Sequence, residues 1–440
     1  MTTSFSSIIN IETGRPQLKD NIIKTIPKNI LNILKEIGKA SEQFGCQAYA
    51  AGGFVRDLFL NTPNFDIDIV IEKNGMEFAK KIAETKGWKL KTHKKFGTAT
   101  LITSDNLKID IASARSEYYK APAALPQVKA GLLSEDVMRR DFTINTILIN
   151  ISPKNFGEIT DIYSGIKDIK NKTVKVLHDI SFIDDPTRIL RAIKFATRFN
   201  FTIDPHTQKL IKEAVDKNIF ASLSGKRFFT ELEYILKEKD PVLPLIKLFE
   251  YKIMQNIHAD IASNAGALSF LNRIKEVISL YKKNDYSEWA LYFIGLINNC
   301  GKEASEDICR YFQIPHNQKI LFCDLRIEAK NLLKNIEKNK TAYRKISVFK
   351  TELILYMMAS LKSPVKREEI FKIYKKAKNT KILTNGNDII KLGIKPGPIF
   401  SEIINRLFEA KIKGDIKTKK KEIDYIKKYL SEETPIIKNS

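Results

Sequence analysis

Hydrophobic and polar positions follow two different periods along the first 175 residues. Apolar side chains recur at helical spacing over residues 30–44 and 75–86, which predicts two amphipathic helices. A further helix is expected after Gly53. Other segments alternate apolar with polar side chains or form short apolar runs, a pattern typical of strands, and they cover residues 46–51, 65–72, 98–102 and 107–112. This mixture predicts an α/β or α+β unit.

After residue 177 the strand pattern stops and helical periodicity takes over. A Gly- and Pro-rich stretch, TNGNDIIKLGIKPGP, interrupts it, and the lysine-rich KIKGDIKTKKK follows a later amphipathic segment. We expect an all-α second half, with helices that include residues 185–200, 207–215, 226–237, 265–281 and 399–410.

Length and composition indicate a globular protein of several domains. The 440 residues predict two to four packed units, at roughly 150 residues per domain. With 43% hydrophobic and 28% charged residues, the chain is neither collagen-like, nor a disordered acidic tail, nor a disulfide miniprotein.

The chain is strongly basic. Its 74 lysines and arginines outnumber 51 acidic residues and leave a formal net charge of +23. Such an excess attracts polyanions, so nucleic acid is the first partner to consider. A general bias toward Lys, Ile and Asn explains the same charge without any partner, and the motifs have to decide between the two.

Cysteine and histidine spacing argues against zinc and disulfides. The four cysteines form no CxxC pair and the five histidines form no HExxH pair. Unpaired cysteines fit a reducing cytoplasm. We expect no export signal and no membrane span, because the sequence has no basic region followed by an apolar core at its start and no run of 18 apolar residues.

Two carboxylates stand in the predicted strand FDIDIVIE. Asp66 and Asp68 are two residues apart, so a strand points both to one face and the intervening isoleucines to the other. Two like charges about 7 Å apart are unfavourable unless a cation lies between them, and Mg²⁺ takes carboxylate oxygens. Asp110, in a second alternating strand, adds a third carboxylate if the two strands are neighbours. Three such acids are the minimum for two-metal phosphoryl transfer, whereas solvated strand aspartates are the plain alternative.

A glycine-rich turn precedes these acids. AAGGFVRD places Gly53 between a predicted strand and a predicted helix. A backbone without Cβ can approach phosphate oxygens closely, and the first helical N–H groups point at them. Arg56, one turn into the helix, adds a cation. A simple tight turn is the alternative, but a glycine pair, an arginine and two strand aspartates rarely coincide in so short a segment.

The basic motif RRDFTIN contributes Arg140 and Asp141. Adjacent guanidinium groups are planar forks that match triphosphate oxygens. Asp141 is a candidate acceptor for a ribose hydroxyl. A surface cluster of mixed charges is the alternative reading of this motif.

The helix predicted in DDPTRILRAIKF carries a candidate base-reading pair. Asp185 and Arg188 are three residues apart and therefore share one helical face. The carboxylate can accept from the amino group of cytosine or adenine while the guanidinium donates to the adjacent ring nitrogen; uracil and guanine present a carbonyl at that position and are rejected. Arg191 and Lys194 continue the series along the helix. The structural alternative is that Asp185 caps the helix before Pro186.

Taken in order, the motifs resemble those of class II bacterial tRNA nucleotidyltransferases. These CCA-adding enzymes share a polymerase-β-like head with bacterial poly(A) polymerases. The likeness is carried by GGFVRD with FDID, then IDIASARSEYYKAPAALP, RRDFTIN, DIYSGIKD, DDPTRILRA and SGKRFFTELE. Farther on, GNDIIKLGIKPGP looks like the tail segment of the same family that approaches the tRNA elbow.

The resemblance implies an α+β architecture. It consists of an N-terminal nucleotidyltransferase head, with helices on a mixed sheet, followed by an all-α neck, body and tail. The expected bounds are an N-terminal extension at 1–27, the head at 28–176, the neck at 177–245, the body at 246–378 and a tRNA-binding tail at 379–440.

The resemblance also assigns roles to residues. Asp66 and Asp68 match the metal-binding carboxylates, and Asp110 is inferred as a third catalytic carboxylate from strand geometry and the family's architecture. Lys194 stands where many relatives have arginine, which keeps the charge but loses the bidentate fork. The remaining matches are nucleotide-binding positions: Gly53, Arg56, Arg140, Asp185, Arg188 and Arg191.

The implied activity is Mg²⁺-dependent addition of C, C and A to tRNA 3′ ends from CTP and ATP. A CC-adding or A-adding specialist, a poly(A) polymerase and a noncatalytic RNA-binding scaffold stay open as alternatives. The segment after Phe96 lacks the Gly-Arg-Arg-Phe stretch associated with bacterial poly(A) polymerases, which favours CCA-type activity. Residues 112–133, a mobile-looking loop with Arg115, Glu117 and Tyr118, are the region expected to discriminate among the specialists.

Overall fold

The chain divides into two compact units, Met1–Glu231 and Leu232–Ser440, and the boundary falls inside helix α10 (Gly225–Leu236). The structure is a computed structural model. It describes residues 9–10, 17–18, 23, 26–93, 97–261, 265–281, 285–334, 342–414 and 416–437. The predicted N-terminal extension lies mostly outside these residues. The predicted division into head, neck, body and tail is finer than these two units and stays a prediction.

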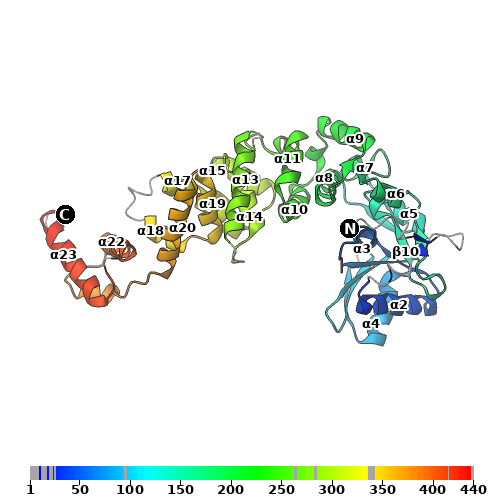
Figure 1. The fold of residues 1–440 in the computed structure, drawn as a ribbon, viewed down its shortest axis with the longest axis horizontal. Helices are drawn as coiled ribbons and strands as arrows, with labels where there is room; N and C mark the ends of the chain where they lie inside the picture. The colour runs from blue at the N-terminus through cyan, green and yellow to red at the C-terminus, as the bar shows by residue number, and fades with distance from the viewer. Residues whose placement is uncertain are drawn as a thin grey trace. The chain divides into compact units, whose positions relative to one another are not determined.

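A seven-stranded mixed sheet forms the centre of the first unit (Figure 1). Only the β4–β7 pair is parallel; the other neighbours are antiparallel. In spatial order the strands are β11 (Ile159–Thr160), β10 (Leu148–Asn150), β3 (Ala48–Ala51), β4 (Ile67–Ile71), β7 (Lys108–Ser113), β6 (Thr98–Ile102) and β5 (Lys89–His93).

The middle strand, β4, alternates as the sequence predicts. Ile67, Ile69 and Ile71 are buried. Asp68 points to the opposite face, and its backbone is in register with Ala51 on one side and Asp110 on the other. The strand is shorter than predicted, because it begins after Asp66. Parallel pairing of β4 and β7 is what makes the carboxylates of Asp68 and Asp110 neighbours.

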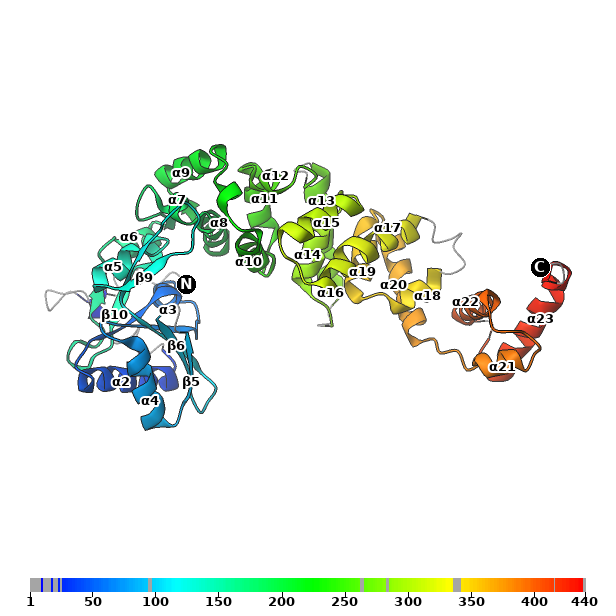
Figure 2. The ribbon, with the colours of Figure 1, turned by 180° about the vertical axis from the view of Figure 1, so that it is seen from behind.

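Helices pack against this sheet. Helix α2 (Lys28–Gln43) contacts β3, α4 (Gly75–Lys86) contacts β5, β6 and β7, and the two helices contact each other (Figure 2). Helix α3 (Gly52–Phe59) follows β3 directly and contacts β3 and β4. Two shorter helices, α5 (Leu133–Met138) and α6 (Gly165–Lys170), come later in the chain.

Residues 112–133, predicted as a loop, contain regular structure. Strands β8 (Arg115–Tyr118) and β9 (Gln127–Ala130) pair antiparallel, and we call them and residues 119–126 between them the ribbon. The prediction of a loop is therefore wrong for the residues of these two strands. Alternating charged and aromatic side chains in RSEYY gave no apolar face from which a strand could be predicted.

The rest of the first unit is mainly helical. It contains α7 (Ser181–Asp184), α8 (Thr187–Phe199), α9 (Pro205–Asp216) and most of α10. Strand formation does not stop at residue 177 as predicted, because β13 (Thr202–Ile203) pairs in parallel with β12 (Thr173–Val174). Two residues are too few to produce a periodic signal.

The described part of the second unit contains helices and no strand. None of its described helices, nor any in the first unit, is long and apolar enough to cross a membrane. The helices are α11 (Val242–Glu250), α12 (Ile253–Ile257), α13 (Ala265–Leu280), α14 (Glu288–Leu296), α15 (Lys302–Tyr311), α16 (His316–Ile320), α17 (Arg326–Lys334), α18 (Ala342–Val348), α19 (Thr351–Ser360) and α20 (Pro364–Asn379), with a π-helical turn at Leu321–Leu325.

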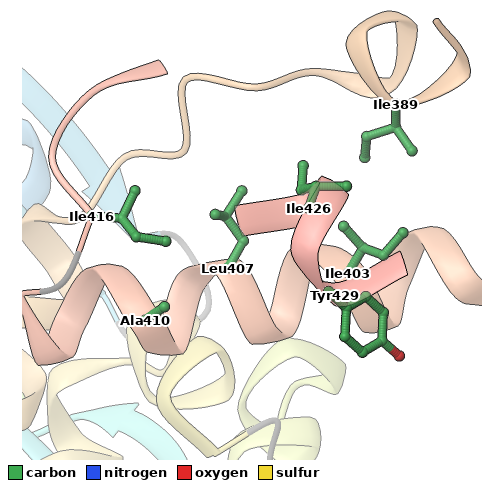
Figure 3. Packing of buried hydrophobic residues seen from close by; sticks show 7 residues of the cluster. All are labelled: Ile389, Ile403, Leu407, Ala410, Ile416, Ile426 and Tyr429. Carbon is green, nitrogen blue, oxygen red and sulfur yellow. The ribbon is translucent and has the colours of Figure 1, made fainter. Parts of the chain in front are cut away.

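The last three helices share their own apolar cluster. Helix α21 (Gly386–Ile390) lies within the predicted Gly- and Pro-rich break, and α22 (Pro398–Lys413) and α23 (Lys419–Ile437) follow. Figure 3 shows the cluster, which consists of Ile389, Ile403, Leu407, Ala410, Ile416, Ile426 and Tyr429. The fully buried Glu422 carboxylate accepts hydrogen bonds from the backbone N–H groups of Leu383 and Thr384 and so fixes the segment before α21 to α23.

Candidate active site

A cleft of about 840 Å³ in the first unit collects ten of the eleven predicted site residues. Lys194 is the predicted residue that does not line it. The ten are Gly53, Arg56, Asp66, Asp68, Asp110, Arg140, Asp141, Asp185, Arg188 and Arg191.

Gly52, the residue before the predicted Gly53, has the stricter requirement for glycine. Its φ is +67°, and a Cβ there would lie 2.8 Å from Oδ2 of Asp68. A side chain at Gly53 would meet only the flexible ends of Arg56 and Asn64, at 3.4 and 3.5 Å. The turn between β3 and α3 therefore brings backbone directly against the Asp68 carboxylate, which only glycine allows.

The three predicted carboxylates line the same cleft but are not equivalent. Asp110 accepts a hydrogen bond from Thr100 Oγ1 at 2.6 Å and another from Lys108 Nζ at 2.9 Å. Asp66 and Asp68 are exposed, and both lie close enough to act electrostatically on Lys108. Within the described residues, no three His, Cys, Asp or Glu side chains converge into a closed metal site. Asp110 is instead engaged by protein donors.

The donor set nevertheless fits a divalent cation. Although the Asp68 side chain is accessible from the cleft, the protein around its carboxylate displaces part of the surrounding water. This loss of water, followed by repulsion from the Asp110 carboxylate, raises the pKa of Asp68 to about 6. A bound cation relieves this repulsion, and carboxylate oxygens are the ligands that hard divalent ions prefer. Asp66 and Asp68 are therefore the residues that would hold a metal, with Asp110 beside them.

Arg56 lines the cleft, and hydrogen bonds to other residues of the protein hold its guanidinium in place. Its Nε donates to Asp57 at 2.8 Å, its Nη1 donates to Asn145 Oδ1 at 2.9 Å, and the side chain is buried. The guanidinium also lies over the rings of Phe199 and Phe195, with centroid distances of 4.6 and 5.1 Å. Its predicted contact with a nucleotide stays a prediction; its observed contacts connect α3 to α8 and to Asn145.

Arg140 presents a donor that the described part of the chain leaves unused. Its Nη1 donates to the Asn145 carbonyl at 2.9 Å and its Nη2 donates to Asp136 at 3.0 Å. Its Nε is buried without a hydrogen-bond partner among the described residues. A buried donor without a partner costs free energy, and an anionic oxygen in the cleft would satisfy it.

Asp141 is fully engaged by protein donors. Its Oδ1 accepts from the Phe142 backbone and from Asn145 Nδ2, each at 2.8 Å. Its Oδ2 accepts from Nε and Nη2 of Arg191 at 2.8 and 2.6 Å. Burial alone would raise the pKa of Asp141, but Arg191 and Asn145 outweigh it and hold the pKa at about 2. A contact between Asp141 and a ribose would have to share one of these donors, so that role stays a prediction.

Lys194 is directed away from the cleft lining. Its Nζ lies 3.0 Å from Glu231, and its side chain is only 6% exposed. Glu231 also lies 3.5 Å from Arg191. Arg198, one turn beyond Lys194, lines the cleft and continues the cationic face of α8 in its place.

Asp185 presents one engaged and one open carboxylate oxygen. Its Oδ1 accepts from the Thr187 backbone N–H at 3.0 Å, from Thr187 Oγ1 at 2.6 Å and from Arg227 Nη2 at 2.9 Å. No hydrogen bond to Oδ2 occurs among the described residues. Helix α8 begins at Thr187 with Pro186, not Asp185, as its N-cap residue, so the capping interpretation is not confirmed even though Asp185 accepts from the Thr187 N–H. The open Oδ2 leaves room for base recognition by the same side chain.

Arg188 is held from two sides. Its Nη1 donates to Ser181 Oγ and its Nη2 donates to the Arg139 carbonyl, each at 2.8 Å. The side chain is buried and lines the cleft beside Asp185. Its Nε has no partner among the described residues and is the nitrogen left to donate to a base.

Several lining residues were not predicted as site residues. Arg139 joins Glu117 of the ribbon to Asp136, at 3.0 and 2.6 Å. The alternation of polar and apolar residues in its strand predicts that Lys108 is accessible, but no sequence pattern indicates that it lies beside the carboxylates. The other unpredicted lining residues include Gly52, His93, Thr100, Tyr119, Asn145 and Arg198. Most of them depend on contacts between distant parts of the sequence.

Family models match two regions of the chain, one on each side of α8. Residues 48–175 match the model described as the poly A polymerase head domain. Residues 200–264 match the model described as a probable RNA and SrmB-binding site of polymerase A. The first match contains the carboxylates and the glycine turn.

Similar proteins extend the match to nearly the whole chain. An A-adding tRNA nucleotidyltransferase of Geobacter sulfurreducens is 33% identical over 94% of this chain and 48% of its own length, so the chain spans about half of that relative. A protein of the same name from Halalkalibacterium halodurans is 29% identical, over 95% of this chain and 97% of its own.

A solved structure agrees with both. The Thermotoga maritima CCA-adding enzyme, in complex with tRNA, is 30% identical and superimposes with a TM-score of 0.77 over 93% of this chain and 97% of its own. Its fold is that of the mixed-sheet head followed by helices seen here. The chain therefore belongs to the family of tRNA nucleotidyltransferases and poly(A) polymerases.

Proposed function

We propose that this chain adds C, C and A to tRNA 3′ ends from CTP and ATP without a nucleic-acid template. The observation that carries the proposal is the composition of one cleft. It combines the carboxylates Asp66 and Asp68, the buried free Nε of Arg140 and the pair Asp185 and Arg188. A metal-bound nucleoside triphosphate has the complementary features: a cation, phosphate oxygens and a base edge.

Mg²⁺ is the cation we propose, held by Asp66 and Asp68. When bound, it would offset the triphosphate charge and activate the attacking 3′-hydroxyl. Lys108 and Thr100 keep Asp110 oriented beside the two ligands. Support for a divalent ion comes from the oxygen-only donor set and from the raised pKa of Asp68.

The chain supplies donors for the triphosphate. Arg140 offers its Nε, and the backbone at Gly52 and Gly53 lets phosphate oxygens approach the first N–H groups of α3. Arg191, clamped on Asp141, lines the cleft from α8. These groups bind and orient the nucleotide so that the α-phosphate faces the 3′-hydroxyl.

Base selection falls to Asp185 and Arg188. Oδ2 of Asp185 accepts from the amino group of cytosine or adenine, and Nε of Arg188 donates to the ring nitrogen beside it. A uracil or guanine carbonyl at the amino position would leave both Oδ2 and the carbonyl without a donor. The contacts of Asp185 Oδ1 and of both Arg188 Nη atoms hold the pair in position.

The tRNA substrate is supported by charge and by the RNA-binding family match. A net charge of +23 favours a polyanion, and residues 200–264 match the RNA-binding model. We propose the head, neck, body and tail at the bounds predicted from the sequence, with neck, body and tail contacting the tRNA backbone. A cytoplasmic location is the one in which tRNA would be available.

The test uses three tRNAs, which end before the first C, before the second C and before the terminal A. Each is incubated with the purified protein, MgCl₂ and one nucleotide at a time. The proposal predicts CMP on the first two, AMP on the third, and little UMP or GMP on any. Long poly(A) products, or no incorporation on any of the three, would contradict it.

A second candidate function is addition of the terminal A alone. The names of the two relatives described above favour it, since both are A-adding enzymes. The same experiment separates the candidates, because an A-adding specialist extends only the third tRNA.

A further inference from the structure

Arg227, on α10, bridges the ribbon and the base-reading carboxylate. Its Nη2 donates to Oδ1 of Asp185 at 2.9 Å, and its Nη1 donates to the carbonyl of Ala123, in the ribbon, at 2.6 Å. Both side chains of the ion pair are largely covered, at 24% and 21% exposed. Arg227 itself is not among the residues that line the cleft.

The segment of the ribbon that Arg227 holds is tightly placed. Ala123 is buried and its φ is +58°, a conformation that residues with a side chain rarely adopt. Its N–H donates to the Ile183 carbonyl at 3.1 Å, while its own carbonyl accepts from Arg227. The Ala123 N–H is therefore bonded to the segment that carries Asp185, and the Ala123 carbonyl is bonded to α10.

The bond from Arg227 acts on the orientation of the carboxylate. Thr187 supplies the other two donors to Oδ1 of Asp185, but both come from within two residues along the chain. Among the described residues, Arg227 is the charged donor to this carboxylate and the donor that is distant from it in sequence. A planar guanidinium can satisfy Asp185 and Ala123 at the same time, so the position of Ala123 and the orientation of Oδ2 are coupled.

The ribbon reaches the second base-reading residue by a separate route. Glu117, in β8, pairs with Arg139 at 3.0 Å, and the Arg139 carbonyl accepts from Arg188 Nη2 at 2.8 Å. Both base-reading side chains are thus connected to the ribbon, Arg188 through Arg139 and Asp185 through Arg227. A displacement of the ribbon would change the spacing between the donor and the acceptor that a base must match.

We propose that Arg227 is a positioning residue that sets nucleobase choice by coupling Asp185 to the ribbon. The inference rests on the proposed function, because it takes Asp185 as the acceptor for the base. Arg227 does not contact the nucleotide; it fixes which way Oδ2 of Asp185 points. Removing it should therefore relax the choice of base more than it weakens triphosphate or metal binding.

The test compares Arg227→Gln and Arg227→Lys with the matched control Lys226→Gln. Lys226 is the exposed neighbour on the same helix, so the control removes an equal charge without the bridge. Single incorporations of CTP, UTP, ATP and GTP are measured on the three tRNAs, as separate kcat and KM values and as a function of Mg²⁺. Thermal unfolding verifies that each variant is folded.

For Arg227→Gln, the ratio of kcat/KM for the correct base to that for UTP or GTP should fall by about tenfold or more, the size expected when a charged hydrogen bond is lost. The Mg²⁺ concentration for half-maximal rate should not change. Arg227→Lys should keep stability but not discrimination, since an ammonium group on a flexible stem does not reproduce the fork. Lys226→Gln should behave as wild type.

A coupled variant tests the role of the ribbon. Replacing residues 121–125 by a glycine-serine linker of equal length should reduce discrimination in the same direction, and combining it with Arg227→Gln should add little. Unchanged discrimination in folded Arg227→Gln and Arg227→Lys, or additive effects in the combined variant, would overturn the inference. Failure of the proposed function is distinct, since wild type itself would then make long poly(A) products or incorporate no nucleotide on any of the three tRNAs.

Discussion

Arg191 clamps Asp141 through two nitrogens, Nε and Nη2, which donate to the same carboxylate oxygen at 2.8 and 2.6 Å. The pair connects the RRDFTIN segment to α8. Because Arg191 also lies 3.5 Å from Glu231, one guanidinium links three parts of the chain that are distant in sequence.

Replacing this carboxylate should reduce stability in a pH-dependent way. Asp141→Asn removes the charge but keeps the shape, and we expect a loss of about 1.5–3 kcal/mol in the free energy of unfolding at pH 7. The folded pKa of about 2 lies below the usual value, so the stabilisation is complete above about pH 4 and disappears as the pH falls toward 2.

Urea unfolding from pH 7 to pH 2.5 measures this effect. The difference in the free energy of unfolding between wild type and Asp141→Asn should be constant down to about pH 4 and become smaller below it. Asp105→Asn, at an exposed site, is the control and should change little. A difference that widens on acidification would show that Asp141 is not the stabilised carboxylate.

Gly52 and Gly87 form a matched pair for testing the turn against Asp68. Both have positive φ, +67° and +66°, but a Cβ at Gly87 meets nothing within 4 Å whereas one at Gly52 would lie 2.8 Å from Asp68 Oδ2. Alanine at either site should cost about 1–3 kcal/mol of backbone strain. Only Gly52→Ala should also abolish most nucleotide incorporation. Equal activity of the two folded variants would show that the close approach to Asp68 has no catalytic importance.

Lys108 offers a test of the electrostatics around the metal ligands. Its ammonium lies 2.9 Å from Asp110 and acts on Asp66 and Asp68, so it opposes a second cation. Lys108→Gln should lower the Mg²⁺ concentration for half-maximal activity by about two- to fivefold, because a screened unit charge contributes about 1 kcal/mol at this range. Lys91→Gln, at an exposed position on β5, is the control. A higher Mg²⁺ requirement in Lys108→Gln would indicate that Lys108 helps to hold the metal site together.

The net charge of +23 should appear as a steep salt dependence of tRNA binding. If the protein neutralises several phosphates, affinity should fall by at least about tenfold between 50 and 200 mM KCl. Filter binding with a tRNA that ends before the terminal A provides the measurement. Affinity that is insensitive to salt would favour composition bias as the origin of the charge.

The sequence was most informative where periodicity was strong. The predicted helix at 75–86 and strand at 98–102 coincide with α4 and β6, and the pairing of β4 with β7 makes Asp68 and Asp110 neighbours as expected. The ribbon and the two-residue β13 were missed, because charged alternation and very short strands carry little apolar signal. The ribbon and β13 form because of contacts between residues that are distant in sequence.

The site was predicted at the level of residue types and positions, but not of partners. Lys194 was expected to face the nucleotide because it continues the three-residue series along α8, yet Glu231, 37 residues later, draws it away from the cleft. Arg227 likewise stands 42 residues from Asp185, too far apart for any local pattern to connect them. Helical spacing predicts a shared face, and only the fold determines which charge lies opposite it.

The central claim is that Asp68 supports nucleotidyl transfer in this cleft, and Asp68→Asn tests it most directly. Incorporation of CMP and AMP on the three tRNAs is measured beside tRNA affinity and thermal unfolding of the same preparation. We predict that incorporation falls by more than about a hundredfold, because even replacing residues that support metal ligands reduces metal affinity or activity by about 10–100-fold. The variant should retain tRNA affinity and folding. Incorporation at the wild-type rate by Asp68→Asn would contradict the account.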